Sequence, residues 1–143
     1  FCRPEGRRTD PSAAFELLVK NVKRRSLVFM ISDFICDDFG EKARAASVKH
    51  DIVAVQVVDP AELDLPHAGR LRLEDPETGR QVEINTSNPR LRHAYESASA
   101  EWQESLAGAF SQLRIDHVVL RTDQDYLPEL QRFFKKRESI VSR

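Results

Sequence analysis

Apolar residues recur along this chain in two patterns, and together they predict an α/β fold. The run at 27–31 is apolar throughout, and the run at 52–58 is apolar except for Gln56. Neither run alternates between apolar and polar residues, which is typical of parallel strands covered on both faces. A shorter run at 117–120 predicts a third covered strand. The segment from about 38 to 50 carries apolar residues at helical spacing, so strand, helix and strand form one crossover unit. The run at 27–31 is expected to be a central strand.

Three further helices follow from apolar positions three and four residues apart. The first runs from Pro11 to Arg25, the longest from Asn88 to Leu113, and the last from Asp125 to Arg137. The apolar stripe of the longest helix, which includes Tyr95, Trp102 and Phe110, is expected to face the core along its whole length.

Residues 70–86 predict an inserted β-hairpin. Apolar and polar residues alternate on both sides of the turn Asp75-Pro76-Glu77-Thr78-Gly79, as in strands with one buried face. Residues 1–143 are therefore expected to form one domain of three layers, with a mostly parallel, Rossmann-like sheet and an accessory hairpin.

Composition and missing motifs argue against several classes of function but do not identify one. The 143 residues are 41% hydrophobic and 31% charged, and a net charge of −1 argues against a nucleic-acid-binding protein. No apolar run approaches the roughly 18 residues of a membrane span. Phosphate-loop, dinucleotide-binding, zinc-protease and serine-hydrolase motifs are missing. The chain starts at Phe1 without a signal peptide, so we expect a piece of a longer protein.

Polar side chains follow the predicted strands at the edge where α/β proteins bind ligands. Ser32, Asp33, Asp59 and Thr122 all stand directly after an apolar run. Asp33, with Asp37 or Asp38 a few residues on, could supply oxygen ligands to Mg²⁺. The alternative is that Asp37 or Asp38 only caps the following helix.

A set of short motifs resembles the bacterial family known as domain of unknown function fifty-eight. In order, they are SDF at 32–34, KHD at 49–51, DPAE at 59–62, DPETG at 75–79 and FFKKR at 133–137. The resemblance runs from about Arg3 to Arg137. It implies that the chain is the C-terminal half of a von Willebrand factor A-like domain. It also implies a cytoplasmic domain of a membrane-anchored protein that works with a MoxR-type AAA+ ATPase, without an established enzymatic activity.

The same resemblance implies a partial metal-ion-dependent adhesion site. That site uses an Asp-x-Ser-x-Ser motif, a later threonine and an aspartate after the fourth strand, and Thr9 and Asp33 occupy the last two positions. Asp-x-Ser-x-Ser does not occur in this chain, and Phe34 stands where metal-binding members of the wider fold carry glycine. We therefore expect Mg²⁺ in the full-length protein and none in this chain.

Three hypotheses of function follow. The first is a protein-interaction module, assisted by a divalent ion, that presents Ser32, Phe34, Asp59 and Glu62 to a partner. The alternative is a magnesium-dependent phosphoryl-transfer or hydrolytic enzyme that uses strand-end carboxylates. The third is a structural assembly domain. Because the strand that would flank 27–31 is missing, we also expect a homo-oligomer formed through that open edge.

Overall fold

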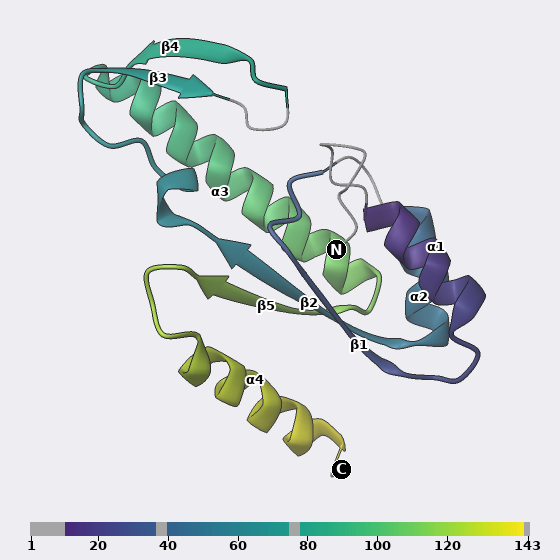
Figure 1. Cartoon of the computed structure of the whole chain (residues 1–143). Helices are drawn as coiled ribbons and strands as arrows, with labels where there is room; N and C mark the ends of the chain where they lie inside the picture. Colours follow the sequence, from purple (N-terminus) through teal and green to yellow (C-terminus); the bar gives the residue numbers. More distant parts are fainter. Residues whose placement is uncertain (1–10, 37–39, 75–77, 142–143) are drawn as a thin grey trace, which may run out of the picture.

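The computed structural model describes residues 11–36, 40–74 and 78–141. Its elements in chain order are α1 (Pro11–Asn21), β1 (Leu27–Ser32), α2 (Gly40–Lys49), β2 (Asp51–Val58), the 3₁₀ turn η1 (Pro60–Glu62), β3 (Arg70–Glu74), β4 (Gln81–Asn85), α3 (Pro89–Gln112), β5 (Asp116–Arg121) and α4 (Tyr126–Val141) (Figure 1). Each predicted element is present. The first helix ends at Asn21, four residues before its predicted end at Arg25.

Three parallel strands form the main sheet, in the order β1-β2-β5. Leu27 pairs with Asp51 and Val53 pairs with Asp116, so the amino ends of the strands lie close to one another. The prediction of a mostly parallel α/β sheet is confirmed. The prediction that 27–31 is a central strand is wrong for this chain, because β2 holds the central position and β1 lies at the edge.

Helices cover both faces of this sheet, which gives the three predicted layers. On one face, Ile52 and Ala54 of β2 pack with buried residues of α1, α2 and α3, among them Phe15 and Phe110. On the other face, Val53 and Val55 of β2, with Val118 of β5, pack against Leu130 and Phe133 of α4. Figure 1 shows α3 above the sheet and α4 below it.

β1 is covered on one face only, contrary to its apolar sequence. Leu27, Phe29 and Ile31 are 51%, 44% and 69% exposed, whereas β2 is buried along most of its length. The physical reason is the position of α4, which packs against β2 and β5. Phe134 of α4 reaches the ring of Phe29 at a centroid distance of 6.0 Å and is itself 39% exposed.

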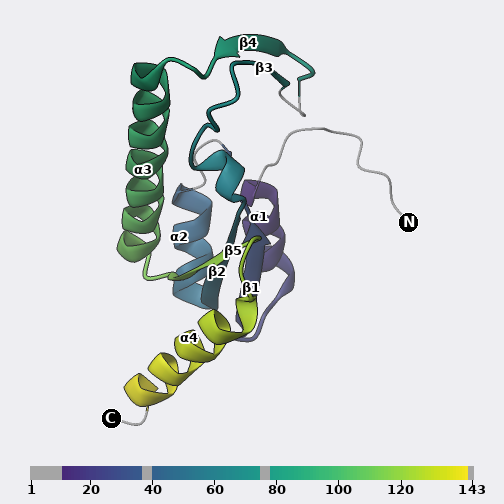
Figure 2. The ribbon, with the colours of Figure 1, turned by 90° about the vertical axis from the view of Figure 1, so that its left-hand side faces the viewer.

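The predicted hairpin is a separate two-stranded antiparallel sheet of β3 and β4. It stands at the amino end of α3, far from α4 (Figure 2). Its base is closed by Thr86, which is fully buried; the Thr86 hydroxyl donates to the Gly69 carbonyl at 2.9 Å and accepts from the Ala68 N–H at 3.0 Å. Gly69 has a φ of 74°, which glycine adopts without a steric penalty.

No helix in the described part of the chain combines the length and the apolar character that crossing a bilayer requires.

Candidate functional site

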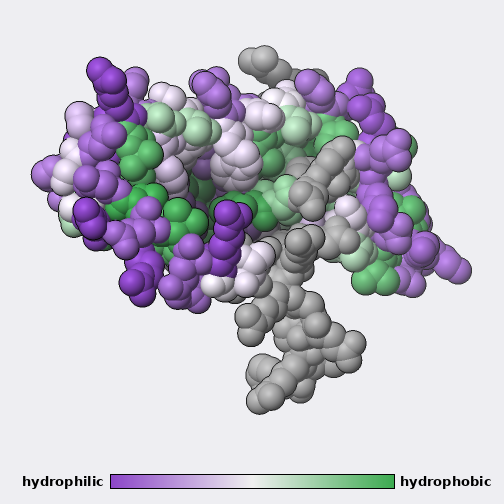
Figure 3. All heavy atoms as spheres, turned by 90° about the horizontal axis from the view of Figure 1, so that it is seen from above, coloured by the Kyte–Doolittle hydropathy of each residue, from purple (hydrophilic) through white to green (hydrophobic). Residues whose placement is uncertain are grey.

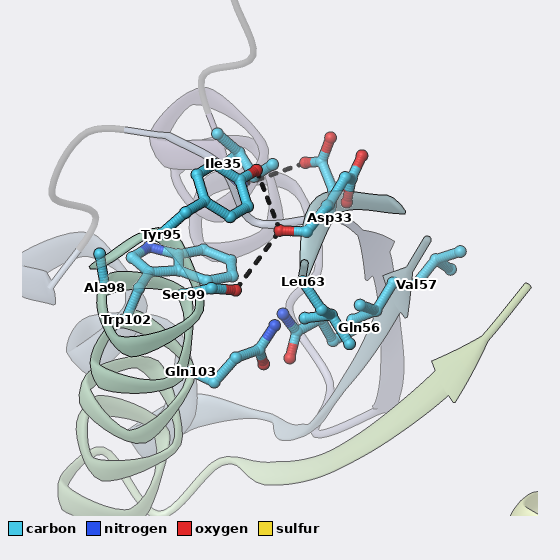
Figure 4. A pocket seen from close by; sticks show the side chains of 12 residues that line it. Asp33, Ile35, Gln56, Val57, Leu63, Tyr95, Ala98, Ser99, Trp102 and Gln103 are labelled. Carbon is cyan, nitrogen blue, oxygen red and sulfur yellow. Dashed lines mark hydrogen bonds between the residues drawn. The ribbon is translucent and has the colours of Figure 1, made fainter. Parts of the chain in front are cut away.

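A cavity of about 290 Å³ opens at the carboxyl ends of β1 and β2. Four segments line it: the loop after β1, the end of β2, the turn η1 and the middle of α3. Figure 4 shows Asp33, Tyr95, Trp102 and Gln103 around this space. From above, apolar side chains surround a hollow on the surface, with hydrophilic side chains toward the rim (Figure 3). The cavity therefore lies at the edge of the sheet where the polar residues after the strands predicted a ligand site.

A tight turn after β1 positions Asp33. The Phe34 N–H donates to the Ser32 hydroxyl at 3.1 Å, and the Ile35 N–H donates to Asp33 Oδ1 at 3.1 Å. Phe34 has a φ of 58°, a conformation that is uncommon outside glycine, and its ring packs edge-on against Phe110 at 5.0 Å. Glycine would adopt this conformation without a steric penalty.

Phe34 and Asp59 were both expected to face a partner, and each also has a structural role. The Phe34 ring is 2% exposed and belongs to the core, so it offers almost no surface to a partner. Asp59 is exposed and caps η1, because its Oδ1 accepts from the Ala61 N–H at 2.9 Å.

Glu62 ends the turn η1 and lines the cavity together with Asp33. Its backbone carbonyl accepts hydrogen bonds from the Tyr95 hydroxyl at 3.2 Å and the Ser99 hydroxyl at 3.4 Å, drawn as dashed lines in Figure 4. These two bonds hold η1 against α3. The structure therefore brings together two acidic residues, Asp33 and Glu62, that lie 29 positions apart in the sequence.

The deepest polar group of the cavity, Gln56, was not predicted. It is completely buried in the middle of β2, and its Oε1 lies 3.0 Å from His117 Nε2. Within the described residues its Nε2 has no hydrogen-bond partner, and the Gln103 side chain extends toward it in Figure 4. Burial lowers the pKa of His117, because charging a desolvated imidazole is unfavourable. The sequence feature that could have indicated this buried polar group is the single glutamine within the apolar run 52–58.

Part of the α3 stripe lines the cavity instead of facing the core. Phe110 and Leu106 belong to the main core, and the half-buried Trp102 packs against this core and also lines the cavity, whereas the half-buried Tyr95 only lines the cavity. The expectation that the whole stripe faces the core is wrong for its first half. α3 is 24 residues long, and its first half extends past the sheet toward η1 and the hairpin.

The predicted metal site is not assembled from the described residues. Across 11–36, 40–74 and 78–141, no three His, Cys, Asp or Glu side chains form a group that could hold a metal ion. Thr9 lies outside the described residues, and so do Asp37 and Asp38 of the enzyme alternative. The Thr9–Asp33 site and the catalytic carboxylate pair stay predictions.

Comparison with known proteins gives the family. Residues 2–105 match the model of a family described as protein of unknown function DUF58. The chain belongs to this family. It is 31% identical over 135 residues to the uncharacterized protein MAV169 of Mycobacterium avium, of which it covers 79%. It is also 31% identical over 135 residues to the uncharacterized proteins Mb1516 of Mycobacterium bovis and Rv1480 of Mycobacterium tuberculosis.

The match to these last two relatives includes 94% of the residues of the DUF58 chain. It covers 42% of the length of each relative. No solved structure matches it significantly. The resemblance drawn from the short motifs is therefore confirmed at the level of the family.

The lining of the cavity in the DUF58 chain suits one class of side chain. Trp102, Tyr95 and Ile35 supply an apolar and aromatic wall, and Asp33 and Glu62 supply carboxylates that are exposed to solvent. A lysine or arginine side chain has a matching division into an apolar stem and a cationic end. Cations also bind favourably over the faces of Trp and Tyr rings.

Proposed function

We propose that the DUF58 chain is a protein-interaction module whose cavity receives a basic side chain of a partner protein. The observation that carries this proposal is the cavity at the carboxyl ends of β1 and β2. There the exposed residues Asp33 and Glu62 line the cavity together with Trp102 and Tyr95. The apolar stem of the incoming side chain would cover this wall, while its charge meets the two carboxylates.

The partner we propose is a MoxR-type AAA+ ATPase. The ordered motifs SDF, KHD, DPAE and FFKKR support this choice through the resemblance to the family. On the same grounds we place the module on the cytoplasmic side of a membrane-anchored protein with a von Willebrand A-like domain. The alternative use of Asp33 is a Mg²⁺ site with Thr9 in that full-length protein, and a bound ion would exclude a basic side chain from this carboxylate.

A second partner is another copy of this chain. β1 lies at the edge of the sheet, and its exposed side chains Leu27, Phe29 and Ile31 are apolar. An edge strand of this kind is a template for pairing with another strand. Self-association through β1 would leave the cavity accessible, because the cavity lies at the carboxyl end of the strands.

Binding of the MoxR-type ATPase from the same bacterium, measured by calorimetry, tests the proposed function. Asp33→Asn and Glu62→Gln keep the side-chain shape and remove the charge, so each should weaken binding about tenfold, the effect of losing roughly 1.4 kcal/mol. Asp64→Asn is the matched control, because Asp64 is exposed and close in sequence but is not part of the cavity wall.

The single tryptophan, Trp102, gives a second readout because it lines the cavity. Its fluorescence should change when the partner binds and should not change in the presence of an acidic control protein. Binding that is unaffected by both charge-removing variants, or an ATPase that does not bind at all, would overturn the proposal.

A further inference from the structure

The amino ends of the three parallel strands carry a second cluster of functional side chains, at the edge opposite the cavity described above. Arg25 stands two residues before β1, His50 directly before β2, and Arg114 two residues before β5. The parallel register brings these positions to one edge of the sheet. We propose that they form a binding site for a phosphate group, free or carried on a small organic molecule.

His50 is the buried centre of this cluster. Its side chain is 1% exposed, and it lines a cavity of about 550 Å³. Its backbone N–H donates to the Ala46 carbonyl at 2.8 Å, which fixes the residue at the end of α2. Neither Nδ1 nor Nε2 has a hydrogen-bond partner among the described residues. A buried polar group without a partner is unfavourable, so a ligand that accepts a hydrogen bond from His50 would be stabilised.

Positive charge surrounds this cavity. Arg25, Arg44 and Arg114 all line it, all three are exposed, and within the described residues no ion pair joins their side chains to a carboxylate. Asp51 is the one carboxylate in the described lining. It is paired with Arg137, whose Nη2 lies 2.5 Å from Asp51 Oδ2, and this guanidinium is shared with Asp116, whose Oδ2 lies 2.9 Å from Nη1. The cavity therefore presents three available guanidinium groups to an anion.

The donor set favours a phosphate over a planar carboxylate. The three arginines come from three separate segments, so together they offer three positive charges and three forks of N–H donors, which suits a doubly charged group with several oxygens better than one planar carboxylate. Ser47 of α2 also lines the cavity, and its hydroxyl donates to the Arg44 carbonyl at 3.0 Å, so the arginines and His50 are the donors that a ligand would meet. A cavity of about 550 Å³ is larger than a phosphate group, so it also has room for an organic remainder. The left-handed backbone of Arg114, with a φ of 56°, sets this arginine at the end of α3.

Nuclear magnetic resonance of the imidazole nitrogens tests the site directly. The whole chain is titrated with inorganic phosphate and, separately, with glycerol phosphate at constant ionic strength, with chloride as the control anion. The His50 signals, assigned with His50→Gln, should shift and saturate with a Kd of about 1 mM or tighter, in the range of weak specific binding. Tighter binding of glycerol phosphate would support an organic phosphate ligand, and equal binding would support free phosphate.

Variants at exposed positions keep the test independent of folding. Arg44→Gln and Arg114→Gln should each weaken phosphate binding about fivefold, because each removes a charged donor. Arg24→Gln is the matched control, since Arg24 is exposed and adjacent to Arg25 but is not among the cavity-lining residues. The control should stay within about twofold of the unaltered chain. His50 signals that do not saturate, or a control that weakens binding as much as the two variants, would overturn the proposal.

Discussion

The open edge of β1 leads to a quantitative prediction of self-association. Leu27, Phe29 and Ile31 keep 51%, 44% and 69% of their surface exposed. Full burial of such a side chain is worth about 2 kcal/mol, so covering the exposed part of all three in both copies contributes about 6 kcal/mol. About six strand hydrogen bonds add a similar amount. Association itself costs at least about 4 kcal/mol and commonly more. We expect a dimer with a Kd on the order of tens of micromolar.

Ile31→Lys is the sharpest perturbation of this dimer, because Ile31 is the most exposed of the three and its substitution leaves the core unchanged. The two copies together lose about 2 kcal/mol of apolar burial, so the dimer should weaken by at least about thirtyfold. Leu17→Lys is the matched control, since Leu17 is 60% exposed on α1, away from β1. Sedimentation equilibrium over a concentration series gives the Kd, and circular dichroism verifies the fold of each variant.

Two results would refute this reasoning. One is a monomer of 16.4 kDa at about 100 μM, a concentration above the expected Kd, with the amides of 27–31 protected from exchange. The other is a dimer that Ile31→Lys leaves unchanged. The first would mean that the chain covers its own edge, and the second that the dimer forms elsewhere.

Three further predictions concern the metal, the hairpin and His117. Calorimetry with Mg²⁺ should give a Kd weaker than about 100 μM, because Asp33 has no cluster of further ligands in the described chain; tighter binding would mean that the site lies elsewhere. Replacing 70–84 with a short Gly/Ser loop should leave cooperative urea unfolding, since neither core cluster contains a residue of β3 or β4; a non-cooperative transition would place the hairpin in the core. Burial lowers the pKa of His117 below 6.5 in the folded state, so its contribution to stability is present above pH 6.5 and is lost as the pH falls below it. The free energy of unfolding should therefore decline less steeply with falling pH in His117→Gln, and identical slopes would contradict this assignment.

The candidate cavity could be predicted in part from the sequence. Asp33 was identified because polar residues after apolar strands gather at one edge of a parallel sheet, and Glu62 was named only among the residues expected to face a partner. Gln56 was missed because a lone glutamine in an apolar run does not reveal which way its amide points. Tyr95 was assigned to the core because helical spacing defines a face of a helix, whereas the neighbour of that face is set by tertiary packing.

The sequence by itself determined the local structure of this protein. Apolar runs, helical spacing and turn residues identified every strand and α-helix of the described residues, and the crossover pattern required a parallel sheet. Tertiary structure alone decided which surfaces these elements cover. β1 and β2 have similar apolar sequences, yet β2 is buried and β1 is half-exposed, because α4 packs over β2 and β5. Likewise, Arg25, His50 and Arg114 are far apart in the chain and meet only because three parallel strands begin at the same edge. Hydrophobicity favours the burial of a segment, and packing decides how much of the segment is buried and against what.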